Sequence, residues 1–195
     1  MGIHHNLTAI HWNYFLALED DLHRLARYVE FSDDNLKAYS LEMARLYLSA
    51  CSEIDVVLKQ LTEKVSPGAK AENIGHYRAA ISPALPQLAS FKVTIQRFGS
   101  NFEPWMNWKD DKSPDWWSDH NDVKHHRHEA FHKANLSNTL KSLAALFVTL
   151  LFLYDDKAKS GHLIPAPSLF GVTDKNFNGT TIGRHGLCVQ YVLNA

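Results

Sequence analysis

The chain has 195 residues, of which 45% are hydrophobic and 21% are charged, a composition typical of one folded domain. This composition excludes a long disordered segment. Twenty Lys and Arg side chains nearly balance twenty-one Asp and Glu, and the formal net charge is -1 with His neutral. The overall charge therefore cannot attract this protein to nucleic acid. Any contact with nucleic acid must use a local basic patch.

The first half of the chain predicts two long amphipathic helices. Apolar side chains recur at helical spacing over about residues 8–29 and again over about 35–65, where a Pro-Gly pair follows. A weaker helix is predicted over about 72–90, because Pro83 and Pro86 disfavour its last turns. We expect these helices to pack side by side.

The middle of the chain predicts a short strand, an aromatic loop and then the strongest helix. The strand is expected at residues 93–95, and the loop at 99–118 carries four Trp side chains that should fold back over the core. The helix is predicted over about 119–155 with Asp119 as its N-cap. Its second half, from Leu140 to Tyr154, is apolar on nearly all sides and should be the central helix of a bundle.

The last 35 residues change character. Short strands are predicted at residues 169–172 and 187–192, joined by the turn-rich stretch 174–179. We therefore expect a mainly α fold, an up-and-down helical bundle of about four to five helices over residues 1–160. A small β appendage would cover residues 161–195.

The N-terminus, the longest apolar run and the two cysteines together predict a cytoplasmic protein. The N-terminus lacks the layout of a signal peptide, and the longest apolar run, Leu143–Tyr154, is too short to span a bilayer. Cys51 and Cys188 are far apart and form no CxxC pair, so we expect two reduced thiols. We expect no membrane contact and no cofactor.

The chemically suggestive side chains gather in residues 116–132. Five of the twelve His lie here beside Lys124 and Arg127, in the half of the predicted helix where an apolar stripe would be expected. On an ideal helix four polar side chains of this segment fall within about 60° of one another. They are Asn121, His125, His128 and His132. A break in the apolar pattern of this kind is a reason to suspect a functional site.

One interpretation of this segment is a zinc site. His128-Glu129-Ala130-Phe131-His132 matches HExxH, in which two His at i and i+4 bind zinc and the Glu activates water. No Glu follows Glu129 to serve as a distant ligand, and Asn135 and Asn138 stand where an extended motif has Gly and His. We keep His128, Glu129 and His132 as an alternative set of metal-site residues.

A second interpretation rests on a family resemblance. The run from Arg127 to His132 is similar to the Arg-polar-…-His motif of the HEPN superfamily, all-helical domains that include many RNases of toxin–antitoxin and phage-defence systems. Further matching residues are Ser40-Leu41-Glu42, Ala50-Cys51-Ser52-Glu53-Ile54-Asp55, Trp117, Asn121, Val123-Lys124-His125, Phe131 and Ala134-Asn135-Leu136. The resemblance covers about residues 10–155.

The resemblance implies RNA cleavage through the 2′-hydroxyl without a metal ion, or RNA or nucleotide binding. Arg127 would hold the phosphate and His132 would transfer protons, in keeping with the chemistry of these side chains. The supporting residues would be Asn121, Lys124, His125, His128 and Glu53, the last orienting a basic group. Arg127 and His132 lie about 140° apart on an ideal helix, so the pair needs a bulge or the cleft of a homodimer. An antitoxin or defence-system partner would complete this setting.

A third interpretation is structural. Lys124 or Arg127 would pair with Glu53 or Asp119, and Asn121 would cap backbone groups of the aromatic loop. Clusters of titratable groups are often buried networks of this kind. The protein would then be an interaction module without catalysis.

Overall fold

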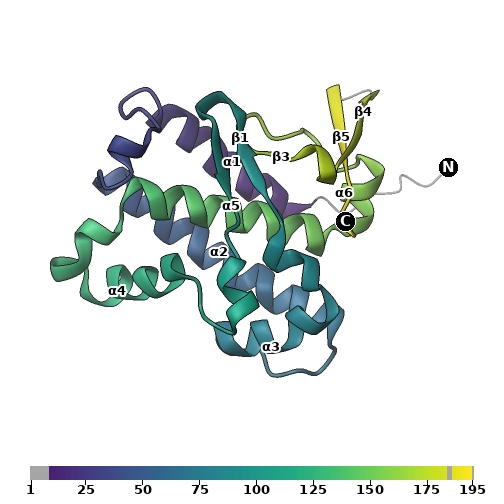
Figure 1. Cartoon of the computed structure of the whole chain (residues 1–195), viewed down its shortest axis with the longest axis horizontal. Helices are drawn as coiled ribbons and strands as arrows, with labels where there is room; N and C mark the ends of the chain where they lie inside the picture. Colours follow the sequence, from purple (N-terminus) through teal and green to yellow (C-terminus); the bar gives the residue numbers. More distant parts are fainter. Residues whose placement is uncertain (1–8, 184–185, 195) are drawn as a thin grey trace.

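The computed structural model describes residues 9–183 and 186–194, and within them the chain forms six α-helices (Figure 1). They are α1 (Ile10–Leu25), α2 (Leu41–Val65), α3 (Ile74–Ala84), α4 (Asp115–Ala130), α5 (Leu136–Leu153) and α6 (Asp155–Ser160). Short 3-10 turns lie at Asp33–Asn35, Pro86–Ser90, Gln96–Phe98, Met106–Asp110, Phe131–Lys133 and Asp174–Asn176. The prediction of a mainly α bundle with a small β appendage is confirmed.

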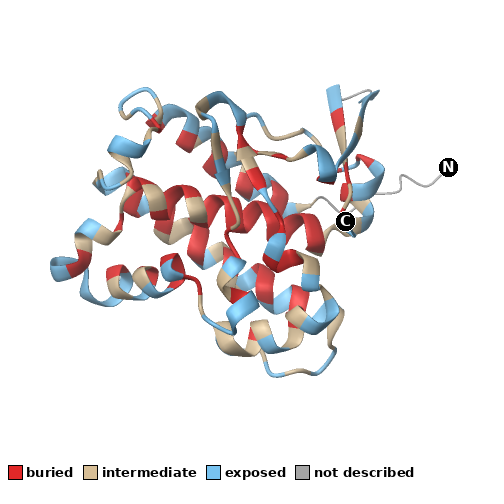
Figure 2. Ribbon diagram, viewed as in Figure 1, coloured by how far each residue is buried: buried red, intermediate tan, exposed pale blue. Residues whose placement is uncertain are grey.

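Helix α5 lies at the centre of the fold and is covered by α1, α2 and α4 (Figure 1; red in Figure 2). By length and composition alone, the helix Leu136–Leu153 is long and apolar enough to cross a membrane. Of that window 83% is buried inside the protein, as it is for the core helix of a bundle. Burial on all sides explains why this helix is apolar all round.

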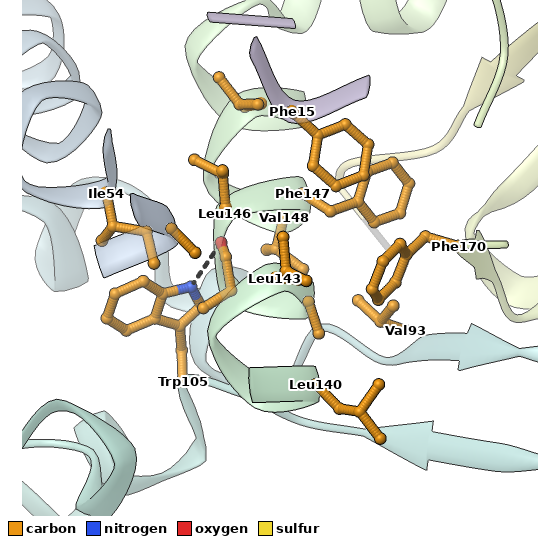
Figure 3. Close-up of a cluster of buried hydrophobic side chains, with 14 of the residues drawn as sticks. Phe15, Ile54, Val93, Trp105, Leu140, Leu143, Leu146, Phe147, Val148 and Phe170 are labelled. Carbon is orange, nitrogen blue, oxygen red and sulfur yellow. Dashed lines mark hydrogen bonds between the residues drawn. The ribbon is translucent and has the colours of Figure 1, made fainter. Parts of the chain in front are cut away.

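The aromatic loop folds over the core, as predicted. Trp105 is fully buried between α2 and α5, where its indole Nε1 donates a hydrogen bond to the Ala145 carbonyl at 3.3 Å (Figure 3). The other three Trp of the segment are also buried, and they are Trp108, Trp116 and Trp117. Their burial ties the loop to the bundle and places the start of α4 against α2.

Two small antiparallel sheets complete the chain. The first sheet contains β1 (Val93–Ile95), β2 (Ser100–Phe102) and β3 (Gly171–Val172), in the spatial order β2-β1-β3. The second sheet pairs β4 (Phe177–Gly183) with β5 (Gly186–Tyr191). The strand predicted at 93–95 is confirmed, whereas the stretch 174–179 predicted as a turn contains the start of β4. The C-terminal segment is also attached to α1, because the buried Glu19 carboxylate accepts the backbone N–H of Ser168, Leu169 and Phe170 at 2.8–3.0 Å.

The single helix predicted over 119–155 is wrong. The chain forms α4, then the turn Phe131–Lys133, and then α5, which begins with Asn135 as its N-cap. The Asn135 side chain accepts the Asn138 N–H at 3.0 Å, and Asn135 also forms an isolated β-bridge with Tyr39. Pairing with a distant segment thus ends one helix and begins the next. Helix α4 itself begins after Pro114, not after Asp119.

Candidate functional site

The large buried side chains of helix α4 lie in its first half. The Tyr47 hydroxyl of α2 donates a hydrogen bond to the Trp116 carbonyl, and Trp116, Trp117 and Val123 are buried against the bundle. Every side chain from Lys124 to Glu129 is exposed. The apolar half therefore positions a polar half that faces solvent (left end of α4, blue in Figure 2).

The polar half of α4 is not a regular helix. His126 has φ -133° and ψ 38°, which interrupts the helical backbone between His125 and Arg127. After Ala130 the chain turns through the 3-10 segment that carries His132. Angles calculated for an ideal helix therefore do not describe how these side chains lie.

Four basic side chains of α4 line one groove of about 750 Å³ between α4 and α2. They are Lys124, His125, Arg127 and His128, and we call this hollow the outer groove. Its apolar lining includes Leu48 and Phe131, and no Asp or Glu lines it. Lys124 and Arg127 form no ion pair with any carboxylate of residues 9–183 and 186–194. An exposed cationic groove of this kind can bind an anion such as phosphate.

The buried network expected for the third interpretation does not involve these groups. Instead Lys133 contacts Asp119 at 2.9 Å and Asp122 at 2.6 Å, measured from Nζ to the nearest carboxylate oxygen. The hydrogen bond to Lys133 lowers the pKa of the Asp122 carboxyl. Asp119 and Asp122 of α4 are thus paired with Lys133, and Lys124 and Arg127 have no carboxylate partner among the described residues.

A second hollow of about 620 Å³ adjoins the outer groove, with Leu48 and Lys124 lining both. This inner pocket lies between α2, α4 and the start of α3. His120 lines it and is 6% exposed, and its Nδ1 is shielded from solvent without a hydrogen-bond partner. Burial, together with the nearby positive charges of Lys124 and His125, lowers the pKa of His120 to about 4. His120 is therefore neutral at physiological pH.

The structure divides the predicted site residues into three groups. Lys124, His125, Arg127 and His128 line the outer groove. Asn121 lines the inner pocket, and the exposed His132 lines neither hollow. Arg127 and His132 therefore do not meet in one groove of this chain, although each was predicted to be catalytic.

Glu53 lies outside the site. Its carboxylate contacts His11 of α1, with 2.5 Å between Oε1 and Nδ1, and His11 Nε2 lies 2.8 Å from Gln60 Nε2. Glu53 was predicted to orient a basic group, and the group it contacts is neither Lys124 nor Arg127. The basic partner is a histidine of the first helix.

The HExxH residues do not gather around a common point. His128 Nε2 contacts Glu129 Oε1 at 3.4 Å, and both side chains are exposed to solvent. Among residues 9–183 and 186–194, no three or more His, Cys, Asp or Glu side chains are grouped so as to hold a metal ion. The zinc alternative thus gains no support from the described residues.

Sequence reasoning missed the inner pocket, and with it His120 and Ser52. His120 is the one histidine of the segment 116–132 that is buried, and its neighbours Trp116 and Trp117 were the available signal. Comparisons of the chain with protein-family models, curated proteins and solved structures found no match. The side chains of the two hollows are thus the basis for a functional proposal.

Proposed function

We propose that this protein binds RNA along the outer groove and cleaves it through the 2′-hydroxyl without a metal ion. The observation that supports this most directly is the lining of the groove by Lys124, His125, Arg127 and His128, with no carboxylate among them. Phosphate contacts dominate the affinity of proteins for nucleic acids, and they need cations that no protein carboxylate has neutralised, as holds for Lys124 and Arg127 among the described residues. The net charge of -1 is no obstacle, because the positive charge is local.

The chemistry assigned to these side chains follows from their positions. Arg127 would hold the scissile phosphate, since a guanidinium forms two parallel hydrogen bonds to phosphate and stabilises the charge of the transition state. His125 and His128 line the groove beside Arg127, so we assign proton transfer to these two. His132 would take part only from a second copy of the chain.

The resemblance to HEPN domains adds a setting to this proposal. In that setting the protein would be a cytoplasmic toxin or phage-defence protein of bacteria. It would act as a homodimer with an antitoxin or defence partner. A protein that binds RNA without cleaving it is the second candidate. The observation in its favour is that His132 lies outside the groove lined by Arg127.

RNA binding can be tested by its salt dependence. Each phosphate contact to single-stranded RNA contributes about -0.7 to the slope of log K against log salt, so Lys124 and Arg127 together predict a slope of about -1.4. Arg127→Ala should reduce the slope by about 0.7, whereas Arg27→Ala, which removes an exposed cation after α1, should not change it. A slope near zero would overturn the proposal.

Cleavage can be tested with a labelled single-stranded RNA in the presence of EDTA. Arg127→Ala and the double variant His125→Ala/His128→Ala should each slow cleavage about 100-fold or more, since one general acid or base contributes about 100-fold to 10,000-fold. The matched control is His23→Ala, which removes an exposed histidine of α1. Binding without cleavage by the unaltered protein would support the second candidate.

The role of His132 can be separated by mixing variants. We expect His132→Ala to retain cleavage. If it does not, an equal mixture of Arg127→Ala and His132→Ala chains distinguishes the alternatives. For a site shared between two chains, about half of the dimers are mixed and one of their two sites is intact, so the mixture would regain about a quarter of the activity. Such a gain would move the reaction to a dimer interface and contradict the assignment to His125 and His128.

A further inference from the structure

We propose that the inner pocket binds the heterocyclic base of a nucleotide whose phosphate lies in the outer groove. This inference rests on the proposed function and names the part of the ligand that would give selectivity. Lys124 lines both hollows, so one ligand can extend from the groove into the pocket past this side chain. The volume of about 620 Å³ lies within the range of small-molecule sites.

The charges of the two hollows differ, and this difference decides which part of a nucleotide each can take. Asp55 and Glu72 line the inner pocket, whereas no carboxylate lines the outer groove. A phosphate would be repelled by Asp55 and Glu72 but attracted by Arg127. A base is uncharged, so it can lie near these carboxylates without that penalty. The phosphate is thus assigned to the outer groove and the base to the inner pocket.

Three polar side chains of the inner pocket are free to recognise a ligand. The Ser52 hydroxyl and the Asn121 amide have no side-chain hydrogen bond within the described part of the chain, and His120 Nδ1 has no partner. Asp55, in contrast, already accepts hydrogen bonds from Tyr77 at 2.7 Å and Lys59 at 2.5 Å. A hydroxyl, an amide and a neutral imidazole each offer both a donor and an acceptor. The edges of bases present donors and acceptors side by side, unlike phosphate, which only accepts.

The walls of the pocket suit the flat, apolar faces of a base. Leu48, Val56 and Ile74 line it from α2 and the start of α3. Trp117 lines it from α4, with its ring centroid 5.5 Å from that of His120. Bases of single-stranded RNA are commonly bound by aromatic stacking and by hydrogen bonds to their exposed edges. The neutral state of His120 adds an acceptor that a protonated imidazole would lack.

The direct test follows the ring signals of His120 by NMR, assigned by their loss in His120→Gln. The probes are the four nucleosides, the four nucleoside 5′-monophosphates, ribose 5-phosphate and inorganic phosphate. We expect saturable shifts of the His120 signals with at least one nucleoside and with its monophosphate, and none with ribose 5-phosphate or phosphate. Equal shifts with ribose 5-phosphate, or no shift with any nucleoside, would overturn the inference.

A pocket-filling variant gives a second readout. Ser52→Phe places a ring at an exposed position of the pocket lining, and Ser118→Phe makes the same change at an exposed position of α4 outside both hollows. Ser52→Phe should weaken binding of the monophosphate at least 10-fold, and Ser118→Phe should leave it unchanged. Equal affinities for the two variants would count against the pocket.

The same measurements separate this inference from the proposed function. Arg127→Ala should weaken binding of the monophosphate but not of the nucleoside, because it acts only in the outer groove. If RNA binds with the expected salt slope while Ser52→Phe has no effect, only the base pocket fails. If nucleosides bind while Arg127→Ala has no effect on RNA, the proposed function fails and the pocket stands. Competition between an RNA oligonucleotide and the monophosphate at the His120 signals shows whether RNA or a free nucleotide is the ligand.

Discussion

His120 should make the stability of this protein depend on pH. Burial and the nearby cations lower its pKa from the ordinary value of 6.5 to about 4 in the folded protein. In the unfolded chain the imidazole is solvated and returns to about 6.5. Well above pH 6.5 the ring is neutral in both states and contributes no pH dependence. Between pH 6.5 and 4 only the unfolded state takes up the proton, so stability is lost as the pH falls through this window.

The size of this loss follows from the two pKa values. One pKa unit corresponds to about 1.4 kcal/mol, so the full effect below pH 4 is about 3 kcal/mol. Between pH 7.5 and pH 5 the free energy of unfolding should fall by about 2 kcal/mol through His120 alone. For a chain of this length such a change lowers Tm by about 4–8 °C.

Chemical denaturation at a series of pH values measures this effect. Comparison with a variant that lacks His120 subtracts the contribution of the other titrating groups. His120→Gln removes the titrating ring but keeps a polar side chain, so the wild-type protein should lose about 2 kcal/mol more than the variant between pH 7.5 and pH 5. His23→Gln, at an exposed position of α1, should follow the wild-type protein at every pH. A constant difference between wild type and His120→Gln across the pH range would refute the reasoning.

Three further predictions concern side-chain contacts elsewhere in the fold. Glu53→Gln should lower the free energy of unfolding by about 1–3 kcal/mol, because His11 loses its charged partner, yet RNA affinity measured alongside should not change. Trp105→Ala should cost about 3–5 kcal/mol in denaturant unfolding, since it empties a fully buried site and removes the hydrogen bond to the Ala145 carbonyl; a cost below 1 kcal/mol would contradict its place in the core. Asn135→Ala should cost about 1 kcal/mol by removing the cap of α5, and unchanged stability would argue against the capping bond.

The local pattern of apolar and polar residues was sufficient to predict the main elements of the fold. The apolar stripe of α2 and the all-round apolar surface of α5 each reflect how a helix is buried, and this information lies in neighbouring residues. The Trp-rich loop was predicted to cover the core because so many large apolar rings cannot remain in water, and its burial is confirmed. The break between α4 and α5 was missed because it depends on a bridge between Asn135 and the distant Tyr39.

Sequence by itself determined that histidines, Lys124 and Arg127 would gather at one end of a helix that breaks the apolar pattern. Only the tertiary structure decided what each of these groups meets. Glu53 contacts His11, Lys133 pairs with Asp119 and Asp122, and Lys124 and Arg127 line the outer groove without a carboxylate partner among the described residues. The burial of His120 and the loss of its charge were decided in the same way. Pairing, burial and pKa depend on side chains brought together from distant parts of the chain, so spacing along one helix could not reveal them.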